Sequence, residues 1–267
     1  QNGYYEVDNT NSNQYFVGKN PDYDYKDDNG DNPLGNNELD QFGYSVSISE
    51  SGEIIVVGAP ENDEAYVFSN DGISVTEIQI LVGSDTLSSD EFGMSVSIDD
   101  DGKNIVVGAP DHDINFNKLP TRIDSGAAYL FYNESSTADW TEIQKLVTNI
   151  PQNNENCGRC VNIRHGQISV GCGGALIQLL NDVRGSLSIF EQSDINQIQI
   201  ADNPSRFELL GRLIPFDIDG ATFIDFGTSC DIFQNQFAIG APGVDLSGIT
   251  DIGSIYSVYC VPTLVCP

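Results

Sequence analysis

Apolar and polar residues alternate at the start of the phrase FGYSVSISESGEIIVVGAP, which occupies residues 42–60. Tyr44, Val46 and Ile48 alternate with serines, and this period of two predicts a β-strand whose two faces have different surroundings. A turn sequence containing Gly52 follows, and the nearly continuous apolar run IIVVG then predicts a second strand that is buried on both faces. The phrase therefore predicts an antiparallel hairpin.

The same phrase recurs along the chain. It returns with a rewritten turn as FGMSVSIDDDGKNIVVGAP at 92–110 and again as FGTSCDIFQNQFAIGAP at 226–242, whereas residues 157–174 hold a degenerate copy. Two further strand patterns follow each of the three copies that come first in the chain. They lie at 64–68 and 75–82 after the copy at 42–60, at 126–132 and 140–147 after the copy at 92–110, and at 185–191 and 207–214 after the degenerate copy at 157–174. One strand pattern, at 253–259, follows the last copy. Four strands in up-and-down order over roughly 45 residues make a sheet of the size of one β-propeller blade.

Helical periodicity is nearly absent, and GGALIQLLNDV at 173–183 is the only candidate helix. We therefore predict an all-β fold, a β-propeller built from about four to five four-stranded antiparallel blades. The repeated phrase then belongs to the scaffold, and we expect function in the segments that do not repeat.

The FG…VVGAP phrases resemble the FG-GAP repeat, which is found in the β-propeller head of integrin α subunits and in many secreted or cell-surface proteins. Three copies match strongly and one is degenerate, so the resemblance covers about residues 38–260. The phenylalanine of each copy should pack between blades, and the glycines should allow close backbone approach. Integrin-type propellers have seven blades, which this chain cannot supply at about 45 residues each.

The two ends of the chain lie outside the repeats, as an N-terminal segment (1–37) and a C-terminal tail (261–267). We expect the N-terminal segment to complete the propeller. It would do so either as a worn fifth blade around QYFVGKN (14–20) or through GYYEV (3–7), which would add a strand to the last blade. If neither occurs, unpaired strand edges remain, and such edges can pair with another chain.

The charge balance excludes several classes of partner. The chain carries 40 acidic against 11 basic residues, a formal net charge of −29, which repels phosphate backbones and anionic membranes. We therefore expect no nucleic-acid binding, and divalent cations or basic partners suit this surface better. No apolar run reaches the roughly 18 residues of a membrane-spanning helix, so we expect no membrane span.

Six cysteines all follow residue 156, namely Cys157, Cys160, Cys172, Cys230, Cys260 and Cys266. Their even number favours disulfides and hence an extracellular protein, either secreted or at the cell surface. A glycosylation sequon at Asn133 fits the same setting. Repeat alignment places Cys157 and Cys172 at opposite ends of one hairpin, with Cys160 competing for the same partner. The last two cysteines could close a short C-terminal loop.

Residues 27–38, DDNGDNPLGNNE, follow the spacing of a Ca²⁺-binding loop. Oxygen-bearing side chains fall at its first, third, fifth and twelfth positions, which are Asp27, Asn29, Asp31 and Glu38. Ca²⁺ is the cofactor that this loop would take, and the alternative is an acidic, solvated loop. The family's own calcium position is the first turn of each blade, and here these turns, DDDG at 99–102 included, are too short or too poor in carboxylates to enclose an ion.

Catalytic motifs are missing from the sequence. His112 and His165 are its only histidines, and neither has a companion at metal-binding spacing or beside a nucleophile motif. We expect both to be ordinary surface residues, and we expect the chain not to be an enzyme. CGRC at 157–160 has the CxxC form, but no helix is predicted after it, so a redox role is not expected.

The long connection DHDINFNKLPTRIDS at 111–125 is the best candidate for partner binding. The equivalent connection in the first blade is only residues 61–64. The long connection should emerge beside the inter-blade loops at 83–91, 148–156 and 215–225. Four residues give it mixed charge: Asp111, Asp113, Arg122 and Asp124.

We therefore expect a non-catalytic extracellular propeller that mediates adhesion or protein recognition through long loops on one face, with a protein or a glycan as its partner. The alternative is a structural subunit of an extracellular filament or coat, which self-assembles into a polymer through blade edges and terminal segments. A third hypothesis is a lectin-like or enzyme-attached propeller whose catalytic machinery lies outside this chain.

Overall fold

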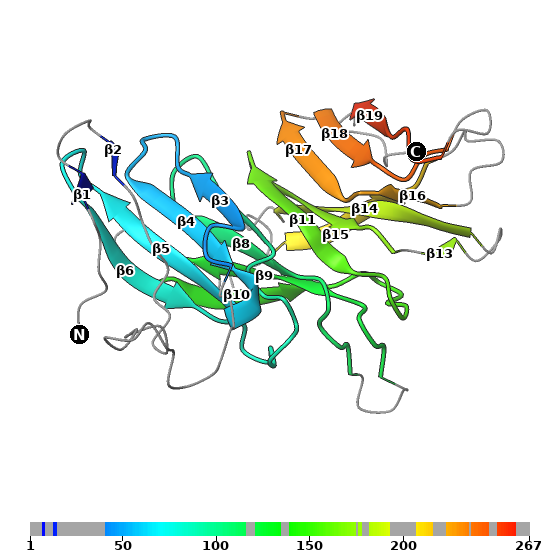
Figure 1. Cartoon of the computed structure of the whole chain (residues 1–267), viewed down its shortest axis with the longest axis horizontal. Helices are drawn as coiled ribbons and strands as arrows, with labels where there is room; N and C mark the ends of the chain where they lie inside the picture. Colours follow the sequence, from blue (N-terminus) through cyan, green and yellow to red (C-terminus); the bar gives the residue numbers. More distant parts are fainter. Residues whose placement is uncertain are drawn as a thin grey trace, which may run out of the picture.

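Four main sheets, antiparallel apart from one pair of strands in the third, follow one another along the chain in the computed structural model (Figure 1). The structure describes residues 7–8, 13–14, 41–115, 121–134, 139–174, 176–177, 182–192, 207–215, 223–234, 236–245 and 250–259. Within these ranges the only helical element is a short 3₁₀ turn, η1 (Pro60–Asn62), and every other element is a strand. The prediction of an all-β fold with propeller blades is confirmed.

The first two copies of the repeated phrase each begin a four-stranded meander. The strands of the first blade are β3 (Ser45–Ile48), β4 (Ile54–Ala59), β5 (Glu64–Asn70) and β6 (Val75–Leu81). The strands of the second blade are β7 (Ser95–Ile98), β8 (Asn104–Ala109), β9 (Ala127–Tyr132) and β10 (Thr141–Leu146). Each strand pairs antiparallel with the next, as the sequence pattern predicts.

The third and fourth blades depart from this regular form. The third consists of β11 (Cys157–Arg164), β12 (Gln167–Cys172), β14 (Asp182–Gln192) and β15 (Phe207–Leu213), and β14 also pairs with β13 (Leu176–Ile177) and, in parallel, with β16 (Phe223–Phe226). The fourth consists, among the described residues, of β17 (Ser229–Phe233), β18 (Gln236–Ala241) and β19 (Ser254–Tyr259).

The candidate helix at 173–183 is wrong. Its described residues form a turn, the short strand β13 and the start of β14, because β13 folds back to pair with β14 through Leu176 and Val183.

A short hairpin, β1 (Val7–Asp8) and β2 (Asn13–Gln14), is described near the N-terminus. Among the described residues these two strands pair only with each other. The rest of residues 1–37 and all of 261–267 lie outside the described residues, so closure of the propeller by the N-terminal segment stays a prediction.

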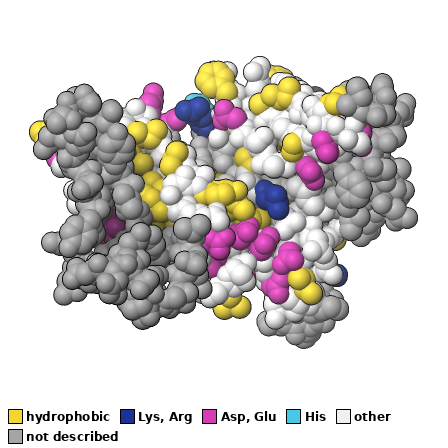
Figure 2. Space-filling model, in the orientation of Figure 1, with side chains coloured by type: hydrophobic (Ala, Val, Ile, Leu, Met, Phe, Trp, Pro, Cys, Tyr) yellow, Lys and Arg dark blue, Asp and Glu magenta, His cyan; other side chains and the backbone are white. Residues whose placement is uncertain are grey.

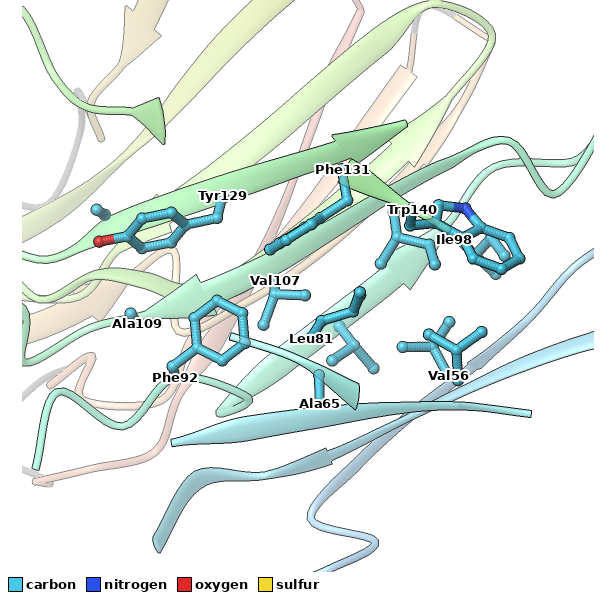
Figure 3. Packing of buried hydrophobic residues seen from close by; sticks show 14 of the residues in the cluster. Val56, Ala65, Leu81, Phe92, Ile98, Val107, Ala109, Tyr129, Phe131 and Trp140 are labelled. Carbon is cyan, nitrogen blue, oxygen red and sulfur yellow. The ribbon is translucent and has the colours of Figure 1, made fainter. Parts of the chain in front are cut away.

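The hydrophobic core lies between neighbouring blades. Val96 and Ile98 of β7 are 7% and 5% exposed because they pack against β4 and β5 of the first blade. Figure 3 shows Phe92 between Ala65 of β5 and Tyr129 of β9, and the rings of Phe92 and Tyr129 have centroids 5.6 Å apart. The repeated phenylalanine therefore does pack between blades.

Backbone contacts between glycines bring the blades close together. Gly58 of β4 lies against the carbonyl group of Gly93 in the next blade, so that a Cβ atom at residue 58 would overlap the carbonyl oxygen. The hydroxyl of Ser45 donates a hydrogen bond to the same oxygen, at 2.8 Å. The second and third blades repeat the contact through Gly108 and Gly158. The glycines recur at the same positions of the repeat because the same close contact recurs from blade to blade.

The contact between the third and fourth blades carries a covalent bond. Gly171 faces the carbonyl group of Gly227, as in the other pairs of blades. Cys160 occupies the strand position of Ser45, and its disulfide to Cys230 replaces the serine hydrogen bond.

Candidate functional site

The β8–β9 connection projects from the second blade as a small hairpin of its own (Figure 1). Its described residues, 110–115 and 121–126, include Ile114 and Arg122, whose backbones exchange two hydrogen bonds of 3.0 and 2.8 Å. Ile114 is only 3% exposed and anchors the connection to the core between the blades. Asp113 accepts a hydrogen bond of 2.9 Å from the backbone N–H of Asp124. The base of the connection is therefore a fixed structure.

The inter-blade loop at 148–156 supports this connection from one side. The backbone N–H groups of Asn154 and Asn156 donate to the carbonyl oxygens of Ile123 and Asp124, at 2.8 and 3.0 Å. The side-chain amide of Asn156 donates to Asp111 at 2.8 Å. The predicted neighbourhood of these two loops is present, whereas residues 216–222 of the third predicted loop lie outside the described residues.

The inter-blade loop at 83–91 supports the connection from the other side, through His112. The expectation that His112 is a surface residue is wrong, because it is 4% exposed. Its Nδ1 atom lies 2.7 Å from the Asp90 carboxylate and its Nε2 atom lies 3.0 Å from the Lys145 ammonium. An ammonium group can only donate, so Nε2 accepts and the ring proton is on Nδ1, from which it is donated to Asp90.

Asp85, whose side chain is 54% exposed, completes this network at its solvent edge. Its carboxylate lies 2.7 Å from Lys145 and accepts a hydrogen bond of 2.8 Å from the hydroxyl of Tyr129. Partial desolvation opposes ionisation of Asp85, but the hydrogen bonds from Lys145 and Tyr129 hold the pKa of its carboxyl below the ordinary value. Burial and the hydrogen bond to Asp85 raise the pKa of the Tyr129 hydroxyl, which therefore stays protonated.

A cavity of about 620 Å³ lies above this network, between the 83–91 loop and the β8–β9 connection. We call it the acidic pocket, because five aspartates line it together with neutral residues and His112: Asp85, Asp90, Asp111, Asp113 and Asp124. Figure 2 shows acidic side chains gathered toward the lower part of the face in view, in the region where the β8–β9 connection projects in Figure 1.

The carboxylates of the acidic pocket interact with one another. Burial raises the pKa of Asp124, and the charges of Asp111, Asp113 and Asp90 raise it further. A positive group entering the pocket would relieve this repulsion. Of the four residues predicted for partner binding, three line the pocket, whereas Arg122 holds the connection through its backbone.

The buried network was missed from the sequence, although one signal could have revealed it. Lys145 stands at the strand position of Ile80 in the first blade, since Lys145 pairs with Tyr129 as Ile80 pairs with Tyr66. A charged residue that replaces an apolar one in an otherwise repeated strand indicates a local function for that blade. His112 likewise stands where the first blade has Asn62.

The first turn of the second blade is a hairpin turn, as expected. Asp99 closes it by accepting hydrogen bonds from the backbone N–H groups of Lys103 and Asn104, at 2.8 and 3.0 Å, and from the Asn104 amide at 2.6 Å. Burial raises the pKa of Asp99 from 3.8 to about 6, and the neighbouring Asp101 adds to the effect. This turn and His165 line a second cavity of about 380 Å³, at the opposite end of β8 from the acidic pocket.

Two disulfides are described. Cys157 pairs with Cys172 across the β11–β12 hairpin, and Cys160 pairs with Cys230. Cys260 and Cys266 lie outside the described residues, as do Asp27, Asn29, Asp31 and Glu38 of the proposed calcium loop. Asn133 is 6% exposed, and its glycosylation stays a prediction.

Comparison with known proteins agrees with this architecture. Residues 35–70 and 75–131 match the model of the FG-GAP repeat. This part of the chain therefore contains FG-GAP repeats, and its described residues lie in the first two blades. FG-GAP propellers are typically non-catalytic, extracellular and engaged in protein recognition, and the two disulfides agree with an extracellular setting.

Among the solved structures, the crystal structure of Saccharomyces cerevisiae Sqt1 is similar to this chain, with 11% sequence identity and a TM-score of 0.44. The alignment covers 83% of this chain and 46% of that one, so the chain spans less than half the length of Sqt1. A search of the curated proteins gives no significant match. In the described part of the chain, no helix has the length and apolar character needed to cross a membrane.

Proposed function

We propose that this chain is a non-catalytic extracellular recognition domain of the kind used in adhesion, and that its acidic pocket binds a basic segment of a protein partner. The observation that carries the proposal is the pocket itself. A long, non-repeating connection is held open against a neighbouring loop, and five aspartates face the space between them. Lysine and arginine side chains are the groups that such a space attracts most strongly.

The dimensions of the acidic pocket support this role. A volume of about 620 Å³ lies within the range of small-ligand pockets and accommodates one or two long basic side chains. The paired groups of His112 and Asp90 line the pocket, and Lys145 holds the other ring nitrogen of His112, so the pocket keeps its shape before a partner arrives. Such preorganisation lowers the entropic cost of binding.

The same network supports a non-catalytic role. Both ring nitrogens of His112 are engaged, one by Asp90 and one by Lys145, so neither is available to a substrate. His165 has a half-exposed side chain in a hairpin turn, 3.7 Å from Asp100, and no described nucleophile is paired with it.

Binding to peptides that carry paired lysines or arginines tests the proposal. Changing Asp111, Asp113 and Asp124 together to asparagine keeps one side-chain oxygen acceptor at each position but removes three charges, and we expect affinity to fall by about tenfold or more. The matched control changes three exposed glutamates elsewhere, Glu50, Glu53 and Glu208, to glutamine. Both variants alter the net charge equally. Equal weakening by the two variants would show that only the overall negative field attracts the peptides.

A further inference from the structure

The first blade exposes the face that the second blade buries. Tyr44, Val46 and Ile48 of the first blade are 56%, 67% and 57% exposed. Val96 and Ile98 stand at the same repeat positions as Val46 and Ile48, and they are almost fully buried against the preceding blade. These three apolar side chains lie on one face of the strand and are exposed to solvent, so this face lacks the partner that its equivalent in the second blade has.

The glycine contact between blades is unfilled at the same place. Gly43 of the first blade is exposed, whereas its equivalents Gly93, Gly158 and Gly227 are buried with their carbonyl groups against the preceding blade. Among the described residues, no atom lies within 4 Å of a Cβ built at Gly43. We call this surface the front face: Gly43, Tyr44, Val46 and Ile48.

The last blade exposes the complementary half of the contact. Gly240 stands at the position of Gly58, but the three described atoms nearest to a Cβ built there all belong to Ser229, whereas at Gly58 the nearest is the carbonyl oxygen of the following blade. Ile255 pairs with Gly240 as Ala65 pairs with Gly58, and Ile255 is 76% exposed whereas Ala65 is buried. We call this surface the back face: Ser229, Gly240, Ile255 and Tyr259, the last being 59% exposed.

We propose that the front face of one copy of this chain packs against the back face of a second copy. The contact would repeat the one that already joins each blade to the next, with Ser229 and Gly240 of one copy against Gly43 of the other. The choice of a second copy follows from complementarity, because the described part of the chain carries one unfilled half of each kind.

The proposed contact is head-to-tail, so that its geometry either closes a ring or continues as a filament. It uses no residue that lines the acidic pocket. A net charge of −29 on each copy opposes association, and we therefore expect added salt to strengthen it.

The native disulfide supplies a sharp test. Cys160 and Cys230 join the third and fourth blades. Cys160 stands at the repeat position of Ser229 on the back face, and Cys230 stands at the repeat position of Val46 on the front face. The variant with both Ser229→Cys and Val46→Cys should therefore form a disulfide between copies, seen as a dimer or larger species on non-reducing gels. The matched control joins Ser229→Cys with Ile150→Cys, which is 63% exposed on a loop outside both faces, and it should stay monomeric.

Two results of the disulfide test would overturn the proposal. A disulfide between residues 46 and 229 within one copy would show that the chain closes on itself. No disulfide between these residues, at concentrations where the folded variant keeps the β-sheet spectrum of the parent, would show that a second copy does not occupy the front face.

Association of the unmodified chain gives a second readout. Sedimentation at about 0.5 M salt should show species of twice the 29.0 kDa chain mass or more. Val46→Asp should weaken association by about tenfold or more, because a buried carboxylate would lie in the apolar contact. Ile150→Asp should leave it unchanged. A monomer under all conditions would contradict the proposal.

Discussion

The Nζ atom of Lys145 lies 3.0 Å from Nε2 of His112, a contact that exists because β10 carries lysine where β6 carries Ile80. This single substitution within the repeat turns an apolar strand position into the centre of a polar network. The network joins the 83–91 loop, the β8–β9 connection and β10, and three of its members, Asp85, Asp90 and His112, line the acidic pocket.

Replacing His112 with alanine should lower the free energy of unfolding by about 2–4 kcal/mol, because Asp90 and Lys145 lose their shared partner in a buried site. Denaturant unfolding monitored by circular dichroism measures the change. His165→Ala is the control, and since that side chain is half exposed we expect a change of no more than about 0.5 kcal/mol. Similar small effects of the two substitutions would show that the buried network adds little stability.

Gly108→Ala should destabilise the fold by about 1–3 kcal/mol or prevent folding, because its Cβ would overlap the carbonyl oxygen of Gly158 and force two blades apart. Gly211→Ala on β15 is the matched control, since no described atom lies within 4 Å of its Cβ position. Thermal melting of both variants provides the comparison. A Gly108 variant as stable as the Gly211 variant would contradict the glycine contact.

The two disulfides should contribute unequally to stability. Cys160–Cys230 spans 70 positions and Cys157–Cys172 spans 15, so the chain-entropy relation assigns about 4 kcal/mol to the first and about 3 kcal/mol to the second. Unfolding of the two double serine variants measures this order. The reverse order would indicate that contacts within the folded hairpin outweigh the constraint on the unfolded chain.

Asp99 should make stability fall as pH rises. Burial raises its pKa from 3.8 to about 6, so the folded state binds the proton more tightly than the unfolded chain. The resulting stabilisation is complete below pH 3.8 and is lost as pH rises through about 6. In Asp99→Asn this component should disappear from unfolding curves measured across that range.

Asp71, in another turn, provides a control of opposite sign. Hydrogen bonds from the backbone N–H groups of Ser74 and Ile73 lower its pKa, so its contribution is present above pH 3.8 and is lost as pH falls. Asp71→Asn should therefore leave the slope between pH 4 and pH 7 unchanged. An Asp99 variant with the parent slope would contradict the assignment.

The calcium loop predicted at 27–38 is tested by melting with and without Ca²⁺. If the loop binds the ion, millimolar Ca²⁺ should raise the melting temperature, because a ligand that binds only the folded state stabilises it. Glu38→Gln should abolish the rise, and Glu50→Gln, which alters the charge equally, should not. The absence of any rise in the parent chain would remove the loop as a metal site.

The repeated parts of the molecule were the predictable parts. Strict alternation in Tyr44–Ile48 and the run IIVVG predicted β3 and β4, and the second copy predicted β7 and β8. Repetition also brought Cys157 and Cys172 together, since each strand position in one blade has an equivalent in the next. Periodicity is informative here because each blade must fit the same neighbour.

The polar network around His112 could not be predicted in the same way. His112, Asp90 and Lys145 come from three segments, and their distances depend on how the blades stack rather than on any local pattern. The candidate helix at 173–183 failed for a related reason. Its apolar residues suit a helix locally, but β14 provides a pairing partner that local periodicity does not reveal.

The bond between Cys160 and Cys230 also has a mechanical consequence. When the two ends of an extracellular protein are pulled, blades can unravel one after another and release their length. Here the covalent link bridges 70 positions, so roughly 240 Å of chain, at about 3.4 Å per residue, stays out of reach of the pulling force. The first two blades would therefore extend under load, whereas the segment between the two cysteines would bear no force until the disulfide is reduced.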